Sequence, residues 1–233
     1  MSILQQIHQQ IFRRYSSVHL LCALVLLLAV TPFIEDSHNG KFVETLLMTV
    51  VMVSAGLAVG AHRRMPWLAS MLLFSTLLVN WSHHLFPKLI PGTTHLYGSV
   101  VFIGFIIYCI LRFIMKAKRV DAEVISAAIS VYLMIGLLWA SAYLIVGELN
   151  PTAFLIHTDP NDPQTMTNFN ALYFSYSSLS TLGFGDIVPI SKMARTLAFM
   201  EAITGMLFVA ILISRLVSMY APLVPPQNSD RKS

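Results

Sequence analysis

The sequence Ser180-Thr181-Leu182-Gly183-Phe184-Gly185-Asp186 interrupts a chain that is otherwise strongly apolar. It lies between the apolar runs 171–179 and 196–213. In the bilayer core a backbone amide or carbonyl without a partner costs several kcal/mol, so non-helical backbone persists there only where protein buries it or where it lines water. The position of this stretch therefore predicts that it lines a pathway through a membrane.

Gly183 and Gly185 occupy alternate positions within this stretch. Because glycine adopts positive φ without steric cost, we expect the backbone to alternate between left-handed and ordinary conformations. Successive carbonyl oxygens then point to one side and form a ladder of ligands. A simple glycine-rich loop after a helix is the alternative, but it does not explain the order of the flanking segments.

Residues 181–186 resemble the selectivity filter of the potassium channel family, with Thr-Leu-Gly-Phe-Gly-Asp in place of the family's Thr-Val-Gly-Tyr-Gly-Asp. Leu and Phe are variations found within the family at these positions. The resemblance covers about residues 123–220, where an outer helix, an extracellular turret, a short pore helix at 168–180, the filter and an inner helix follow in the family's order. It implies a K⁺-coordinating filter, with the backbone carbonyls of its first four residues and the first hydroxyl as ligands. The filter residues are Thr181, Leu182, Gly183, Phe184 and Gly185.

The composition is that of a polytopic membrane protein, with 56% hydrophobic and 11% charged residues. Six apolar runs have the length of about 20 residues that a transmembrane helix needs. They are 17–34, 42–60, 66–86, 96–115, 124–147 and 195–219. We expect an all-α membrane protein with six transmembrane helices and a re-entrant pore helix and selectivity filter between helices five and six.

This pattern divides the chain into four parts. We expect a cytoplasmic lead at 1–16, a four-helix transmembrane domain at 17–120, a pore domain at 121–220 and a short cytoplasmic tail at 221–233, too short to form a soluble regulatory domain. In the run His95–Leu111 there is neither Arg nor Lys, so the four-helix domain is not expected to sense voltage.

The net charge of +4 is a signal of topology rather than of nucleic-acid binding. In the six-helix arrangement most basic residues fall on one side, which the positive-inside rule assigns to the cytoplasm. Both termini are then cytoplasmic, in a cell membrane that we expect to be a bacterial inner membrane. The residues on that side are Arg13, Arg14, Arg63, Arg64, Arg112, Lys116, Lys118, Arg119, Arg215, Arg231 and Lys232; Lys41, Lys88, Lys192 and Arg195 fall on the other.

One filter segment per chain supplies a quarter of a ring, so the expected partners are three further copies in a homotetramer, and the lipid bilayer. No nucleophile, base or metal constellation suggests an enzyme, a cofactor or a metal other than permeant K⁺. His83 and His84 are adjacent on a helix and point about 100° apart, which is poor geometry for joint metal ligation. With His95, they are interpreted as interfacial polar residues.

Three polar residues flank the filter. Asp186 either concentrates cations at the outer mouth or braces the filter through a hydrogen bond. Arg195 either pairs with an acidic residue near the filter or is an exposed interfacial side chain. Glu201 lies inside the last span, where an ionisable residue is a functional candidate; we expect it to approach the pore helix near Ser177 or Ser178, or to be a protonated or hydrogen-bonded packing residue.

The inner helix carries a central glycine, Gly205. The resemblance implies a gating hinge there, but close helix packing explains the residue equally well. The resemblance also implies that Met206, Val209 and Ile213 face the cavity below the filter, and an apolar lining gates by dewetting.

The sequence thus predicts a potassium-selective channel that conducts passively through a homotetrameric pore. A less selective cation channel and a non-conducting subunit or membrane adaptor are the alternatives, although an adaptor has no need of alternate glycines. A secondary transporter predicts inverted repeats and broken helices in both halves, and the sequence has neither.

Overall fold

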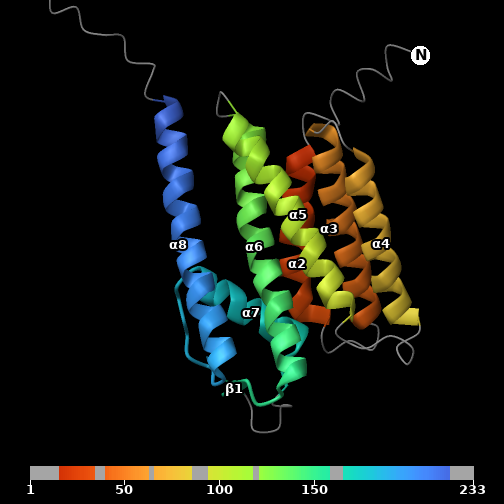
Figure 1. The fold of residues 1–233 in the computed structure, drawn as a ribbon, viewed down its shortest axis with the longest axis vertical. Coiled ribbons are helices and arrows are strands. Elements are labelled where there is room, and N and C mark those ends of the chain that lie inside the picture. The colour runs from red at the N-terminus through yellow and green to blue at the C-terminus, as the bar shows by residue number, and fades with distance from the viewer. Residues whose placement is uncertain are drawn as a thin grey trace, which may run out of the picture.

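The computed structural model describes residues 16–34, 40–62, 66–85, 94–117, 121–157 and 165–220 (Figure 1). These residues form long antiparallel helices, one short helix and a small two-stranded sheet. The elements are α2 (Ser16–Ile34), α3 (Gly40–His62), α4 (Pro66–Leu85), α5 (Thr94–Lys116), α6 (Ala122–Leu149), β1 (Phe154–Ile156), α7 (Asn168–Leu179), β2 (Ile187–Pro189) and α8 (Lys192–Tyr220).

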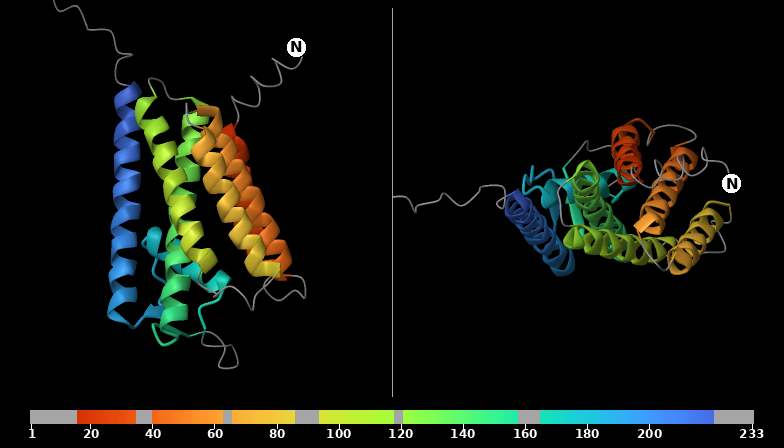
Figure 2. Two further views of the ribbon diagram at one scale, coloured as in Figure 1. Left: turned by 45° about the vertical axis from the view of Figure 1, so that its right-hand side comes forward. Right: turned by 90° about the horizontal axis from the view of Figure 1, so that it is seen from above.

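Helix α6 is the centre of the arrangement. It contacts α2 and α5 on one side, and α7 and α8 on the other. Two further views show α8 on the flank of α6, away from α3 and α4, with α7 at one end of the molecule (Figure 2). The chain therefore has two parts that meet along α6, a four-helix bundle of α2–α5 and a unit of α6, α7 and α8.

Five helical segments of the described residues are long and apolar enough to cross a membrane, and they make the chain a multi-pass helical membrane protein. They are Ser16–Ile34, Phe42–Gly60, Leu96–Lys116, Ala122–Leu149 and Lys192–Arg215. The segment expected as the third span coincides with α4, whose described apolar part, Ser70–Ser82, is shorter than the others.

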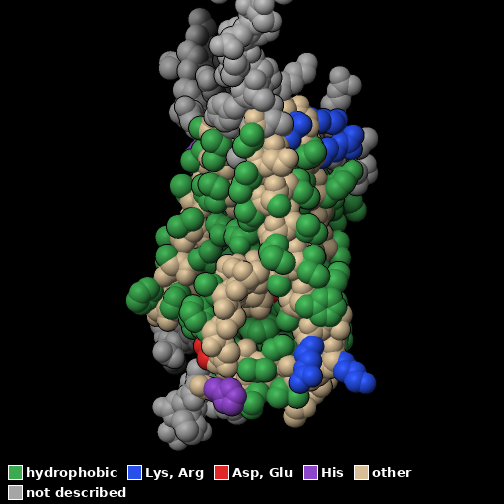
Figure 3. Space-filling view, turned by 90° about the vertical axis from the view of Figure 1, so that its left-hand side faces the viewer, with side chains coloured by type: hydrophobic (Ala, Val, Ile, Leu, Met, Phe, Trp, Pro, Cys, Tyr) green, Lys and Arg blue, Asp and Glu red, His purple; other side chains and the backbone are tan. Residues whose placement is uncertain are grey.

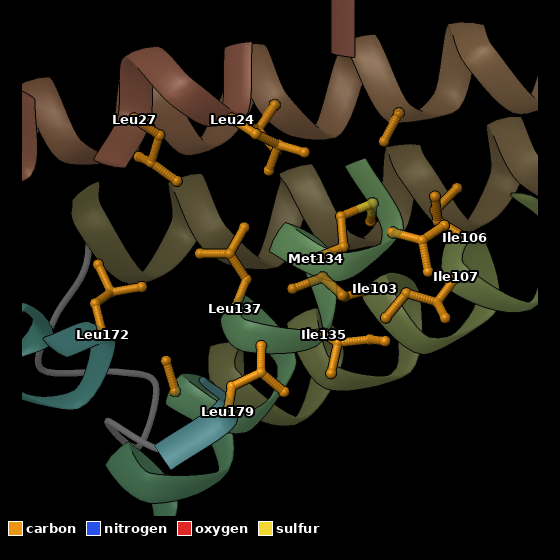
Figure 4. Packing of buried hydrophobic residues seen from close by; sticks show 14 of the residues in the cluster. Leu24, Leu27, Ile103, Ile106, Ile107, Met134, Ile135, Leu137, Leu172 and Leu179 are labelled. Carbon is orange, nitrogen blue, oxygen red and sulfur yellow. The ribbon is translucent and has the colours of Figure 1, made fainter. Parts of the chain in front are cut away.

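The buried apolar side chains join the two parts of the molecule (Figure 4). Leu24 of α2, Ile103 of α5 and Met134 of α6 belong to one continuous cluster. The same cluster reaches Leu172 and Leu179 of α7. Because this core continues from the bundle into α7, the short helix has a fixed support.

The segment between α6 and α7 contains a strand that the sequence did not predict. β1 pairs antiparallel with β2, with Leu155 opposite Val188. The turret that the resemblance implies is therefore not a loop throughout, because β1 lies within it. The strands have three residues each, too few for a period-two pattern to stand out from its surroundings.

The surface of the α8 side has the distribution of a membrane protein (Figure 3). Hydrophobic side chains cover the middle of this face, and Lys and Arg side chains gather at its two ends. The N-terminal end of α2 and the C-terminal end of α8 lie at the same end of the molecule, opposite to α7 (Figure 1).

Candidate functional site

The short helix α7 ends directly before residues 181–185, the filter segment. Its start is capped by Thr167, whose side chain accepts a hydrogen bond from the Asn170 amide at 3.2 Å. Its end is fixed by Leu179, which is 1% exposed. Helix C-termini carry partial negative charge, so this end favours a cation on the axis beyond it.

The backbone that follows alternates in handedness. Gly183 and Gly185 have φ values of 56° and 84°, as the alternate glycines predicted. Thr181 also has a positive φ, of 59°, while Leu182 and Phe184 between them do not. A positive φ in a β-branched residue is a true outlier, and sequence reasoning missed it. The alternation thus extends over residues 181–185.

Hydrogen bonds hold this backbone against the end of α7. The Leu182 amide donates to the Ser177 carbonyl at 2.9 Å, and the Thr181 amide donates to the Ser178 carbonyl at 3.0 Å. These donors satisfy carbonyls that a helix C-terminus leaves without intrahelical partners. In the described part of the chain the carbonyls of residues 181–185 accept no such bond. Their oxygens are available as ligands.

The filter segment is uncovered in the single chain. Leu182 and Phe184 are 64% and 66% exposed. The Phe184 ring stacks on Tyr173 of α7, with 5.9 Å between centroids and 13° between ring planes. Behind this ring an open cavity of about 290 Å³ is lined by Tyr132, Tyr173, Tyr176, Ser177, Ser180, Leu182 and Phe184.

Asp186 and Arg195 follow the filter segment in the chain. The Asp186 carboxyl accepts a hydrogen bond from the Ile187 amide at 3.0 Å, and the Tyr173 hydroxyl of α7 interacts with the same carboxyl. Arg195 is exposed, and its Nε donates to the Pro189 carbonyl at 3.1 Å. Within the described residues, the partner of Arg195 is thus a carbonyl rather than a carboxylate.

Glu201 is fully buried behind α7. Its Oε1 lies 2.5 Å from the Ser175 Oγ, and its Oε2 lies 2.5 Å from the Tyr143 Oη of α6. The approach to the back of α7 is as expected, but the expected partners Ser177 and Ser178 are wrong. The carbonyls of these two serines instead accept hydrogen bonds from amides of the filter segment. The sequence carried no signal for Tyr143, which lies 58 residues away.

Gly205 touches the end of α7. A Cβ at this position would overlap the Leu179 carbonyl oxygen, so the structure supplies the close packing that was one of the two explanations for this glycine. A second glycine, Gly136 of α6, is equally constrained, because a Cβ there would overlap the Tyr176 ring.

The residues implied to line a cavity lie further along α8. Met206, Val209 and Ile213 are 57%, 42% and 56% exposed. The helix runs continuously from Lys192 to Tyr220, so these side chains stand on the C-terminal half of one straight element.

The histidine side chains considered as metal ligands, His83, His84 and His95, lie outside those that the structure describes. In the part of the chain that it does describe, no group of three or more His, Cys, Asp or Glu side chains is arranged to hold a metal ion.

Comparison with known proteins agrees with this geometry. Residues 131–221, which run from α6 through α8, match the family model Ion_trans_2, described as an ion channel. The chain is 33% identical over 63 residues to the voltage-gated potassium channel Kch of Escherichia coli, covering 27% of this chain and 14% of that protein. It is 35% identical over 51 residues to the inward rectifier potassium channel Kirbac3.1 of Paramagnetospirillum magnetotacticum, covering 22% and 17%.

A plant protein is similar over an alignment of comparable length. The chain is 41% identical over 56 residues to the two-pore potassium channel 4 of Arabidopsis thaliana, covering 23% of this chain and 20% of that protein. The similarity thus spans at most a fifth of each relative. No solved structure matches the chain.

Proposed function

We propose that the chain forms a potassium-selective channel that conducts passively through a homotetrameric pore. The observation that carries the proposal is the alternating backbone of residues 181–185, with positive φ at Thr181, Gly183 and Gly185. The amides of residues 181–183 donate to carbonyls at the end of α7, and the carbonyl oxygens of residues 181–185 remain available. Rings of such oxygens replace the hydration shell of K⁺. The ion-channel family model matches this region, and the similarity of the chain to three potassium channels supports the choice of ion.

A homotetramer accounts for the surfaces that the single chain leaves uncovered. Only 11% of the apolar window of α8 is buried, against 61% of that of α6. The exposed filter segment and the open cavity beside Phe184 lie next to this surface. Four copies arranged around an axis cover them and place four carbonyl ladders face to face. Met206, Val209 and Ile213 then line the cavity below the filter.

The arrangement in the membrane follows from the charges. Arg112, Lys116 and Arg215 lie at the helix ends opposite α7 and are assigned to the cytoplasm by the positive-inside rule. With α4 as a sixth span, both termini are cytoplasmic and the filter opens outward. Residues 17–120 form a four-helix domain that supports the pore without a voltage-sensing charge ladder, and residues 121–220 form the pore domain.

The roles of the flanking residues complete the proposal. Asp186 concentrates cations at the outer mouth and braces the filter through Tyr173. Arg195 holds the start of α8 to the end of β2 through Pro189. Conduction requires no cofactor, and K⁺ is the permeant ion.

The proposal is tested by ion uptake into liposomes that contain the purified protein. Under an outward K⁺ gradient the vesicles should accumulate a tracer of ⁸⁶Rb⁺, while an equal Na⁺ gradient should drive little accumulation. Accumulation under both gradients indicates the less selective channel. Accumulation under neither, from a protein that elutes as four chains of 26.0 kDa, indicates the non-conducting subunit.

A further inference from the structure

The side chain of Glu201 joins three helices at a point that the conduction pathway does not use. It extends from α8, it is 0% exposed, and it contacts Tyr143 of α6 and Ser175 of α7. Tyr132 and Tyr176 are the further titratable groups that interact with it. The groups that interact with this carboxyl from α6 and α7 are Tyr132, Tyr143, Ser175 and Tyr176, and each of them carries a neutral hydroxyl rather than a positive charge.

Three short contacts between oxygen atoms meet at this point. The Tyr143 Oη lies 2.5 Å from the Glu201 Oε2, and the Ser175 Oγ lies 2.5 Å from the Glu201 Oε1. The Ser175 Oγ also lies 2.8 Å from the Gly136 carbonyl oxygen of α6. Each contact requires one proton between its two oxygens.

The supply of protons depends on the state of the carboxyl. A hydroxyl carries one proton, whereas a carboxylate and a carbonyl carry none. With Glu201 ionised, Tyr143 and Ser175 provide two protons for three contacts, and one pair of oxygens is left without a proton inside the protein. With Glu201 protonated at Oε1, three protons serve three contacts.

We propose that Glu201 is a neutral positioning residue that holds the pore helix α7 between α6 and α8. Its Oε1–H donates to Ser175, the Ser175 hydroxyl donates to the Gly136 carbonyl, and the Tyr143 hydroxyl donates to Oε2. This chain of hydrogen bonds runs from α8 through α7 to α6, and every O–H group in it donates to an acceptor.

The position of this chain of hydrogen bonds links it to the filter. Ser175 and Leu179 lie four residues apart on α7, and Glu201 and Gly205 lie four residues apart on α8. The contact between Glu201 and Ser175 and the contact between Gly205 and Leu179 are therefore successive contacts, one helical turn apart on both helices. Together these two contacts fix the position of α7 along the axis of α8. Because α7 ends directly before the filter segment, they also fix where that segment begins. This consequence rests on the proposed function, but the protonation of Glu201 does not.

Infrared spectroscopy tests the protonation without any measurement of conduction. Wild-type protein in liposomes at neutral pH, with and without ¹³C-labelled glutamate, should show a label-sensitive carbonyl stretch of a protonated carboxyl group. That band should disappear in Glu201→Gln and persist in Glu148→Gln, which removes an exposed carboxyl of α6. In Tyr143→Phe the band should shift, because Oε2 loses its donor. A wild-type spectrum with carboxylate bands alone overturns the proposal.

Flux measurements test the positioning role. In Glu201→Gln the amide donates to Ser175 and its carbonyl accepts from Tyr143, so we expect ⁸⁶Rb⁺ flux and K⁺ over Na⁺ selectivity within about twofold of wild type. Glu201→Leu has a similar size but no polar atoms. It leaves the buried Tyr143 hydroxyl without its acceptor and the Ser175 hydroxyl without its donor. We expect that variant to lose about tenfold or more of the selective flux, or to lose the tetramer.

Three further outcomes distinguish an error about Glu201 from an error about the proposed function. A loss in Glu201→Gln as large as that in Glu201→Leu overturns the proposal, since it means that the negative charge is required. So does a wild-type flux that rises or falls between about pH 7 and 5 while that of Glu201→Gln stays constant. A wild type that conducts no ion at all contradicts the proposed function, and the infrared result then still decides the state of Glu201.

Discussion

At the scale of single residues, the filter segment contains positive-φ conformations that are unfavourable for residues with a Cβ. A Cβ at Gly183 or Gly185 meets nothing within 4 Å in the single chain. The obstacle to a larger residue is therefore the positive φ of 56° or 84° rather than a clash. Left-handed conformations cost a residue with a Cβ about 1–2 kcal/mol.

We therefore expect Gly183→Ala and Gly185→Ala to abolish selective conduction without preventing membrane insertion. The matched control is Gly104→Ala in α5, where a Cβ also meets nothing within 4 Å but where φ is not positive. K⁺ and Na⁺ permeability measured on the three variants decides the point. Wild-type selectivity in either filter variant contradicts the assignment of the filter.

Gly205→Ala tests why the inner helix carries a glycine. Its Cβ would overlap a backbone oxygen, which cannot move aside as a side chain can. We expect α7 and α8 to separate, with a loss of about 1–3 kcal/mol in the free energy of unfolding and reduced selectivity. If Gly205 serves only as a hinge, alanine should leave thermal stability unchanged and alter open probability alone.

The sequence predicted some of these residues and not others, for physical reasons. Alternate glycines are a direct signal of positive φ, so Gly183 and Gly185 were found. Thr181 was not, because a β-branched residue normally avoids that conformation and adopts it here under the constraint of its bond to Ser178. The pairing of Tyr143 with Glu201 depends on how α6 packs on α8, which no local pattern encodes.

At the scale of elements, one side chain connects the two parts of the chain at the end opposite the filter. The Arg215 guanidinium of α8 donates to the carbonyls of Met115 and Ala117 at the end of α5, at 2.8 and 3.1 Å. A basic group at a helix C-terminus is favourable, because it meets carbonyls without helical partners. The bundle of α2–α5 is thereby attached to the part of α8 that a gate would use.

We expect Arg215→Met to change open probability while leaving selectivity intact. Methionine keeps much of the apolar stem of the arginine side chain but loses both hydrogen bonds. Each such bond contributes about 1 kcal/mol to stability. Arg112→Met is the control, because it removes an exposed arginine from the same end of α5. Single-channel recording in planar bilayers measures both quantities. Equal open probability in the two variants contradicts a role for this attachment in gating.

Most helices were predictable because each is marked by an apolar run of about 20 residues. The helical runs expected at 17–34, 42–60, 66–86, 96–115, 124–147 and 195–219 correspond to α2, α3, α4, α5, α6 and α8 within a few residues. The β1–β2 pair was missed, because three-residue strands are formed by their pairing with each other rather than by a sequence period.

At the scale of the whole molecule, the sequence of α5 predicts that the four-helix bundle is not a steep voltage sensor. The run His95–Leu111 of α5 contains no Arg or Lys. Each elementary charge that crosses the field contributes about 2.3 kcal/mol per 100 mV, so a bundle without such charges does little electrical work. We expect only a shallow response to voltage that varies with the permeant ion. Gating currents recorded without permeant ions should be near zero, and several elementary charges per subunit would refute the prediction.

The uncovered surfaces define what the single chain leaves incomplete. The filter segment and α8 are exposed on one side, and a single ladder of carbonyls cannot enclose an ion. The single copy of the filter motif in the sequence already predicted that several copies must come together to enclose an ion. Neither the sequence nor one folded chain contains the contacts between those copies. On the proposed function the ion pathway therefore belongs to the assembly of four copies, and its selectivity is the property to measure.

The reversal potential of purified wild-type protein in a planar bilayer, with K⁺ on one side and an equal concentration of Na⁺ on the other, tests the central claim most directly. If four copies of residues 181–185 coordinate K⁺ through their carbonyl oxygens, the current should reverse only at a potential strongly displaced from zero, in the direction of the K⁺ equilibrium potential. The same displacement should be absent in Gly185→Ala. A wild-type current that reverses near zero would contradict the account, because K⁺ and Na⁺ would then pass equally well.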